Sequence, residues 1–185
     1  MSPNRWEMPA IYVSTGDPET VNDATPAYKG QVGMRYTIKQ PTSSQPGAEA
    51  GRSKRYQYVQ TDSTMTVAPF ASAVAWWADK TKYMVTTSPT ALGRGRIAGV
   101  FQNAITPGYF GFVQIEGPGL VKFIDAVAVA PSAVGLFVIP SATAGKADTL
   151  AAGTAASYPA LGVTAGAYNA AEATAVVDLN VPETT

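Results

Sequence analysis

The chain has 185 residues, which is enough for one compact domain or for one domain with an arm. Its 13 Lys and Arg residues balance 13 Asp and Glu residues, so the chain lacks the basic excess that is typical of nucleic-acid-binding proteins. Cysteine and histidine are both absent, which excludes disulfide bonds, metal sites built on Cys or His, and histidine-dependent catalytic triads.

The composition favours an all-β fold. The chain has 31 Ala but only 6 Leu, and leucine is the usual filler of helical cores. Its 17 Gly and 14 Pro residues recur every few positions, as expected for short strands joined by tight turns. Charged residues make up only 14% of the chain, against about a quarter in ordinary soluble domains, so we expect partners to cover part of the surface.

The sequence predicts neither a secretory signal peptide at its start nor a membrane span. Residues 1–7 lack the basic and apolar regions of a secretory signal peptide. No run of residues approaches the ~18 consecutive apolar positions that a membrane span needs. We therefore expect a protein that is made in a cytoplasm-like compartment and contacts no membrane.

Residues 1–55 are predicted to form an extended N-terminal arm. They are polar and interrupted by Gly and Pro, and strand patterns occur only at residues 11–13 and 34–38. Such a segment buries too little apolar area to order itself, so it is either a flexible tail or an arm that folds on another molecule. The second interpretation is favoured by side chains that a solvated tail does not need, namely Trp6, Met8, Ile11, Tyr12 and Tyr36.

An internal repeat divides the β domain, residues 56–185, into two units at about 60–117 and 123–182. Val-Ala-Pro followed by Ser-Ala-Val occurs in both units, as do an Ala/Leu-Gly-Val segment and a closing alternating strand. In the second unit the motif runs into an apolar strand, so the ambiguous segment 70–80 is also expected to be a strand. Because one unit is too small to bury a core, two are expected to share a β-sandwich or a closed, β-tulip-like β-barrel.

Candidate catalytic groups are few. Glu116 and Asp125 are the only acids between residues 97 and 139, and a glycosidase needs two such groups. The sequence around Glu116 instead predicts a turn at residues 116–119, with Asp125 at the start of the next strand. We therefore predict that the protein is not an enzyme and binds no cofactor or metal.

Two further motifs are candidates for ligand binding. Residues 93–96, Gly-Arg-Gly-Arg, could clamp a phosphate, but they lack the rest of a nucleotide-binding loop and are predicted to be a turn. Trp76 and Trp77 could stack on a sugar, and so could Tyr109. Adjacent residues on a strand face opposite sides, so at most one tryptophan is expected to be exposed, where it would more often mark a protein interface.

Charge is unevenly distributed along the chain. Residues 1–96 carry 11 basic and 7 acidic groups, whereas residues 97–185 carry 2 and 6, giving net charges of +4 and −4. This asymmetry suits a module that docks one end on a partner. Arg52, Lys54 and Arg55 form the only basic cluster, and three charges are too few for specific nucleic-acid recognition.

Four short segments of the β domain form a recognisable pattern: ITPG at 105–108, YFGFVQIEG at 109–117, VAP at 129–131 and AVVDLN at 175–180. With them, the segment from about residue 60 to 182 resembles the small, β-rich capsid decoration (cement) proteins of tailed bacteriophages. Members of that family often show a Val-Ala-Ala/Pro-Gly-type turn, an Ala-Gly-Val strand and a closing alternating strand.

The resemblance implies a structural virion protein, made in the host cytoplasm, that sits on the outer surface of an expanded head. It would join neighbouring subunits of the major capsid protein, as a homo-oligomer in which a trimer is favoured over a dimer, without contacting nucleic acid. The alternative is a fibre or tail module that binds host-surface carbohydrate through Trp76, Trp77 or Tyr109. The residues predicted to contact protein are Arg5, Trp6, Ile11, Tyr12, Tyr36, Arg52, Lys54, Arg55, Trp76, Trp77, Arg94 and Arg96.

Overall fold

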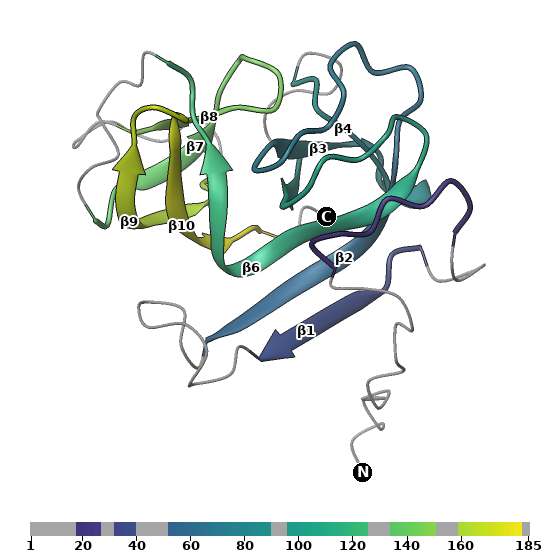
Figure 1. Ribbon diagram of the computed structural model, residues 1–185, viewed down its shortest axis with the longest axis horizontal. Coiled ribbons are helices and arrows are strands. Elements are labelled where there is room, and N and C mark those ends of the chain that lie inside the picture. Colours follow the sequence, from purple (N-terminus) through teal and green to yellow (C-terminus); the bar gives the residue numbers. More distant parts are fainter. Residues whose placement is uncertain are drawn as a thin grey trace.

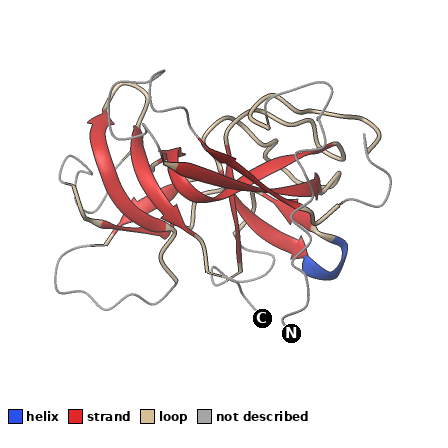
Figure 2. Ribbon diagram, turned by 90° about the horizontal axis from the view of Figure 1, so that it is seen from below, coloured by secondary structure: helices blue, strands red, loops and turns tan. Residues whose placement is uncertain are grey.

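The computed structural model of the protein describes residues 18–26, 32–39, 52–89, 96–125, 134–150 and 159–182. In these ranges it contains ten β-strands, one short 3₁₀ helix and no α-helix (Figure 2). The predicted all-β class is therefore confirmed. The strands are β1 (Arg35–Lys39), β2 (Ser53–Thr61), β3 (Val74–Asp79), β4 (Met84–Thr86), β5 (Ile97–Phe101), β6 (Phe110–Lys122), β7 (Phe137–Pro140), β8 (Ala147–Thr149), β9 (Gly162–Asn169) and β10 (Thr174–Asn180), and the 3₁₀ helix is η1 (Lys80–Lys82).

Five strands close into a barrel. Their order is β2-β4-β3-β5-β6, and pairing between β6 and β2 completes the ring. One hydrophobic cluster has members on all five strands and fills the interior. It combines the large rings of Trp77 and Phe101 with the small Ala75 and Ala98, because a barrel of so few strands has little room inside. Of the two predicted architectures, the closed barrel is the one that forms.

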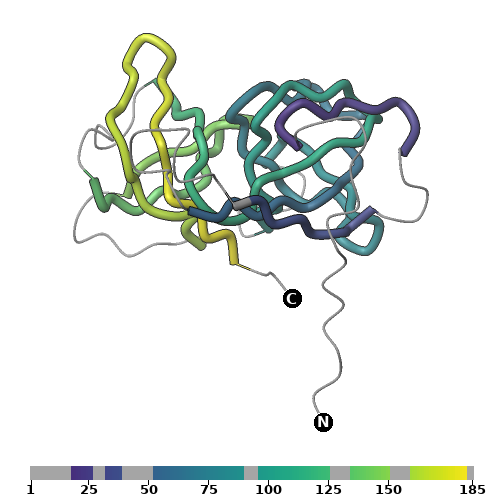
Figure 3. The backbone as a smooth tube through the Cα atoms, turned by 60° about the horizontal axis from the view of Figure 1, so that its bottom comes forward, coloured from purple at the N-terminus to yellow at the C-terminus, as the bar shows by residue number. Residues whose placement is uncertain are grey.

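Beyond the barrel, β6 continues into a second sheet in the order β6-β10-β9-β7-β8 (Figure 1). The inner face of this sheet packs on the outside of β3 and β5 through a buried cluster that includes Trp76, Phe123 and Leu179. After β10 the chain returns to the barrel, where the Val181 N–H donates to the Ile115 carbonyl at 3.0 Å (Figure 3). The barrel and the second sheet thus share the buried cluster between them and the long strand β6.

Corresponding strands of the two predicted units hold equivalent places in the sheet. β3, β5 and β6 belong to the first unit, and β7, β9 and β10 belong to the second. The order β3-β5-β6-β10-β9-β7 sets the two groups end to end, with β6 beside β10. An internal repeat would produce this arrangement, and the unit boundaries themselves stay a prediction.

The turn predicted at residues 116–119 is wrong, because β6 runs through these residues without interruption. Gly117 has φ +88°, a conformation that favours glycine, at the point where β6 leaves its pairing with β2 and continues along β10. A Cβ on Gly117 would lie 2.2 Å from the Ser53 carbonyl oxygen. The Gly-Pro-Gly sequence is therefore a bend within one long strand that joins the barrel to the second sheet.

Residues 18–26 and side chains of β1, which pairs edge to edge with β2, form a buried cluster on the outer face of β2 and β6. Tyr56 and Phe112 are buried there, and Tyr36 of β1 meets the Phe112 ring edge-on, with 5.2 Å between the ring centroids. The strand predicted at residues 34–38 is thus confirmed as β1. Its edge-on aromatic contact and its five-residue pairing with β2 tie it to the barrel.

The expected limit of the arm at residue 55 falls inside β2. The described parts of the arm, residues 18–26 and 32–39, lie on the barrel, and Asp23 forms a β-bridge with Phe110. The remaining parts of the arm, including the strand predicted at 11–13, lie outside the described residues, namely in 1–17, 27–31 and 40–51.

Met65 and Val67 alternate with polar residues, a pattern that is typical of a strand, but no strand forms there. Residues 62–73 are turns and bends instead. The Asp62 carboxylate accepts from the Thr64 N–H and hydroxyl, both at 2.8 Å, which closes a local turn just after β2. Pro69 has no N–H to donate to a sheet, so the apolar alternation is overridden by local hydrogen bonding.

Candidate functional site

Two members of the predicted basic cluster are bound to acids of this same chain. The Arg55 guanidinium lies 2.7 Å from the Glu116 carboxylate, which joins β2 to β6. Arg52 forms an ion pair and hydrogen bond with Asp178 of β10, which joins the barrel to the second sheet. These two cations therefore stabilise contacts between strands on either side of the bend in β6. A partner protein would meet them already paired with acids of this chain.

The third member, Lys54, is buried, and its Nζ lies 3.1 Å from the Glu19 carboxylate. The Tyr56 hydroxyl donates to the same carboxylate oxygen at 2.5 Å. Because a buried ammonium needs a paired acid, this contact anchors the segment 18–26 on the barrel. Lys54 is thus a structural residue within the chain.

Both tryptophans are buried, with exposed fractions of 0% for Trp76 and 5% for Trp77. They face opposite sides of β3, as the alternation predicts: Trp77 enters the barrel, and Trp76 enters the core between the barrel and the second sheet. Neither ring is on the surface to stack on a sugar. Of the aromatic residues considered for carbohydrate binding, only Tyr109 is partly exposed.

The carboxylates considered for catalysis are also in ion pairs. Glu116 pairs with Arg55, and Asp125 lies 3.5 Å from the Lys146 ammonium. Within the described ranges, no group of three or more His, Cys, Asp or Glu residues is arranged to hold a metal ion. Glu116 is therefore placed to hold β2 and β6 together, and Asp125 is paired with a lysine of this chain. The absence of an enzymatic activity stays a prediction.

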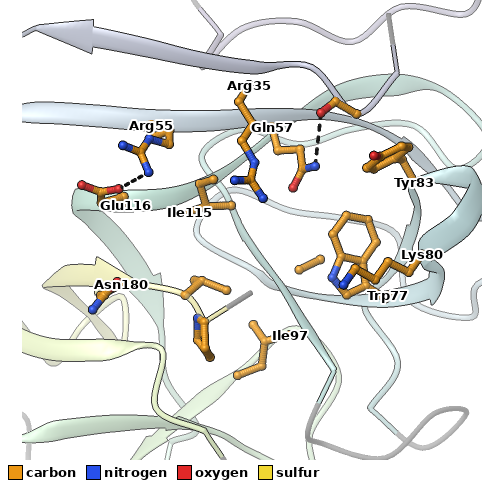
Figure 4. Close-up of a pocket in the computed structure, with 14 residues that line it drawn as sticks. Arg35, Arg55, Gln57, Trp77, Lys80, Tyr83, Ile97, Ile115, Glu116 and Asn180 are labelled. Atoms are coloured by element: carbon orange, nitrogen blue, oxygen red, sulfur yellow. Dashed lines mark hydrogen bonds and ion pairs between the residues drawn. The ribbon is translucent and has the colours of Figure 1, made fainter. Parts of the chain in front are cut away.

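A cavity of about 400 Å³ opens at one end of the barrel, where β1, η1 and the residues after β10 meet (Figure 4). We call it the barrel-mouth cavity. Its volume is within the range of ligand-binding pockets. Its walls are formed by Gly33, Arg35, Arg55, Gln57, Trp77, Lys80, Tyr83, Ile97, Ala98, Ile115, Glu116, Asn180, Val181 and Pro182.

The turn that presents Lys80 to the cavity is built by Asp79. The Asp79 carboxylate caps η1, accepting from the Thr81 N–H at 3.0 Å and from the Thr81 hydroxyl at 2.7 Å. Hydrogen bonding from the Thr81 side chain favours the charged carboxylate and so lowers the pKa of Asp79 from its ordinary value. Tyr83 ends the turn in the left-handed conformation, with φ 52°, and packs edge-on against Trp77.

The described residues that line the cavity include three cations, Arg35, Arg55 and Lys80, and one acid, Glu116, so these four residues carry +3 and −1, a net charge of +2. Arg55 belongs to the basic cluster seen in the sequence, whereas Arg35 and Lys80 do not stand out there, because closure of the barrel brings these distant positions together. The only local signal was the alternation in β1, which places Arg35 and Thr37 on one side of the strand and Tyr36 on the other.

A second feature is the solvent-facing side of the second sheet. Cross-strand partners lie on the same face of a sheet. Leu120 is opposite Val176, Phe137 is opposite Val163, and Val163 is opposite Asp178, which lies two residues from Val176 along β10. Their side chains therefore share this side, with Asp178 and its ion-pair partner Arg52 among them. The exposed fractions are 47% for Leu120 and 56% for Phe137. We call this surface the outer apolar face, consisting of Leu120, Phe137, Ile139, Val163 and Val176.

Of the other predicted contact residues, Arg96 is exposed, and its carbonyl accepts from the Trp77 N–H at 2.9 Å. Tyr36 is half-buried against the barrel. Tyr36 shares one face of the β1–β2 pair with Lys54, whereas Arg55 lines the barrel-mouth cavity. The remaining predicted contact residues, Arg5, Trp6, Ile11, Tyr12 and Arg94, lie outside the described ranges.

In comparisons with protein-family models, with curated proteins and with solved structures, nothing matches this chain. Among the described residues, no helix is long and apolar enough to cross a membrane. The functional conclusion therefore rests on the sequence resemblance and on the surfaces described above.

Proposed function

We propose that this protein binds the outer surface of a bacteriophage head and cements neighbouring subunits of the major capsid protein. The observation that carries the proposal is the outer apolar face. Exposed apolar residues grouped on a rigid sheet are typical of protein interfaces. The sheet is held to the barrel by a shared core and by the Arg52–Asp178 pair, so it presents its residues in a fixed arrangement.

The fold suits this mechanical role. A head filled with DNA is under outward pressure, and a clamp that contacts several subunits at once gains affinity from effective concentration without any single strong contact. We propose that the protein acts as a homo-oligomer, with a trimer favoured over a dimer. The resemblance motifs at residues 109–117 and 175–180 fall largely on β6 and β10, the adjacent strands that join the two halves.

The outer apolar face can be tested with Phe137→Glu. We expect this variant to bind expanded, DNA-filled heads at least about tenfold more weakly, because a carboxylate would be buried against an apolar partner. The measurement is co-sedimentation of the purified protein with heads of the bacteriophage that encodes it. The matched control is Val67→Glu, which makes the same kind of change at another exposed apolar residue, 38% exposed, in the connection between β2 and β3 and so outside the outer apolar face. Equal binding by both variants and wild type would contradict the role of this face.

The N-terminal segment can be tested by deleting residues 2–17. This deletion leaves β1 and residues 18–26 in place, so Tyr56 and Phe112 stay buried in their cluster. We expect head binding to weaken roughly tenfold, because an arm that orders on the shell adds contacts to those of the domain. The same co-sedimentation assay measures the effect, and an unchanged thermal unfolding midpoint serves as the control. Undiminished binding would remove Arg5, Trp6, Ile11 and Tyr12 from the contact surface.

A further inference from the structure

We propose that, when no head is present, two copies of this protein pack the outer apolar face of one against the same face of the other around a two-fold axis. The inference rests on the outer apolar face of the proposed function and deepens it by naming the partner that covers this face in the free protein. It does not rest on head binding itself, because self-association is measured without heads. The homo-oligomer proposed above is the head-bound form, whereas this dimer is the free form.

The outer apolar face is continuous across four strands. β6, β10, β9 and β7 are neighbours in the second sheet, and Figure 1 shows β6, β10 and β9 side by side. Leu120, Val176, Val163 and Phe137 belong in turn to these four strands, and Phe137 is more than half exposed. An exposed apolar patch of this kind usually marks a protein interface. Two such sheets can pack face to face, as the two layers of a β-sandwich do.

One ion pair lies within this apolar face and decides which partner fits it. Asp178 of β10 is directly opposite Val163 and pairs with Arg52, and the side chains of Arg52 and Asp178 are 36% and 35% exposed. A purely apolar partner would remove the remaining water from both charges and offer them no new hydrogen bonds, which is unfavourable. A fitting partner therefore brings a cation and an anion of its own.

A second copy of the chain supplies both charges. In a two-fold contact every pair of touching residues occurs twice, so an axis that passes beside the ion pair sets Arg52 of each copy against Asp178 of the other. Four charges of alternating sign then meet, and their sum is zero. Each charge keeps its partner within the chain and gains one across the contact, which is the complementarity expected of a specific interface.

The charges at the border of the face are also of both signs. Lys122 follows Leu120 by two residues along β6, and Asp148 is the cross-strand partner of Ile139. They lie on β6 and β8, the first and last strands of the second sheet. An apolar centre with a polar rim is typical of protein–protein interfaces. A contact between two copies therefore buries the apolar residues and keeps Lys122 and Asp148 at its rim.

The test is sedimentation-velocity ultracentrifugation of the purified full-length protein without heads, at concentrations of about 1–100 μM. We expect a reversible equilibrium between monomer and dimer. Phe137→Glu and Leu120→Glu should each weaken dimerisation at least about tenfold, because a carboxylate would be buried twice in the contact. The matched control is Val67→Glu, which lies outside the face and should dimerise as wild type does.

Charge reversal tests the two-fold arrangement. Arg52→Glu alone and Asp178→Arg alone should each dimerise at least about tenfold more weakly, because like charges would then meet across the axis. An equimolar mixture of the two variants should form a heterodimer, since one copy carries two acids at the axis and the other carries two bases. Each variant also loses the ion pair within its own chain, which mixing does not restore, so rescue in the mixture reports the contact between copies alone.

Thermal unfolding shows whether each variant is folded. A monomer at every concentration, a trimer, a dimer that persists in both Phe137→Glu and Leu120→Glu, or no rescue in the mixture would overturn the inference. The proposed function fails separately, if the protein dimerises in this way and does not bind heads. A protein that stays monomeric and binds heads through the same face would overturn this inference and leave the proposed function intact.

Discussion

The Gly117→Ala variant is expected to be less stable than wild type by about 3 kcal/mol or more, because two penalties add at this position. Its φ of +88° is a conformation in which a Cβ is strained. The added Cβ would also lie 2.2 Å from the Ser53 carbonyl oxygen, which is backbone of β2 and cannot rotate away. The measurement is the free energy of unfolding from urea denaturation, followed by circular dichroism.

Gly135→Ala is the matched control for this variant. Gly135 has nearly the same φ, +89°, but a Cβ there would meet nothing within 4 Å. Its expected cost is therefore the conformational penalty alone, about 1–2 kcal/mol. If both variants lose the same stability, the close contact between Gly117 and β2 is not important. A folded domain has only about 5–15 kcal/mol of stability, so the larger loss should also reduce the soluble yield.

The Trp76→Ala variant is expected to lose about 3–5 kcal/mol of unfolding free energy. Trp76 is fully buried and is the largest side chain in the core between the barrel and the second sheet. Its removal leaves a void that the surrounding strands cannot close, because both sheets are held by their own hydrogen bonds. Urea denaturation measures the loss, and a change below about 1 kcal/mol would contradict the importance of this core.

Trp76→Phe should separate packing from hydrogen bonding at the same position. The Trp76 Nε1 atom is buried and has no hydrogen-bond partner among the residues that the structure describes, so its removal costs no hydrogen bond to them. The expected loss is therefore about 1–2 kcal/mol, due to the smaller ring alone. A loss as large as that of Trp76→Ala would show that the indole N–H has a partner, for example an ordered water.

Local sequence patterns predict strands correctly where the structure depends on interactions between residues close in the sequence. The alternation at residues 34–38 and the repeat that assigned residues 70–80 to a strand correspond to β1 and β3. The pattern failed at residues 65–67, where the Asp62 side chain closes a turn, and at residues 116–119. Gly-Pro-Gly ordinarily forms a turn, and it becomes a bend in a strand only because β2 and β10 pair with β6 on either side.

The candidate sites were less predictable. Arg52, Lys54 and Arg55 stand out as a basic cluster in the sequence, yet each is paired with an acid from a distant segment. The barrel-mouth cavity gathers Arg35 and Lys80, which the sequence separates. The outer apolar face depends on the register of four strands, which no single strand reveals.

By itself, the sequence determined the all-β class, the likeness between the two halves and the lack of histidine and cysteine chemistry, because these depend on residue type and short-range periodicity. Only the tertiary structure decided that the strands close into a barrel, that the basic cluster is neutralised, and that Trp76 and Trp77 are buried. The physical reason is that ion pairing, burial and strand register depend on contacts between segments far apart in the chain. The charges illustrate this. They sum to zero in the composition, but in the structure Arg52 and Asp178 form an ion pair that joins the barrel to the second sheet, and Arg35, Arg55 and Lys80 meet at the barrel mouth.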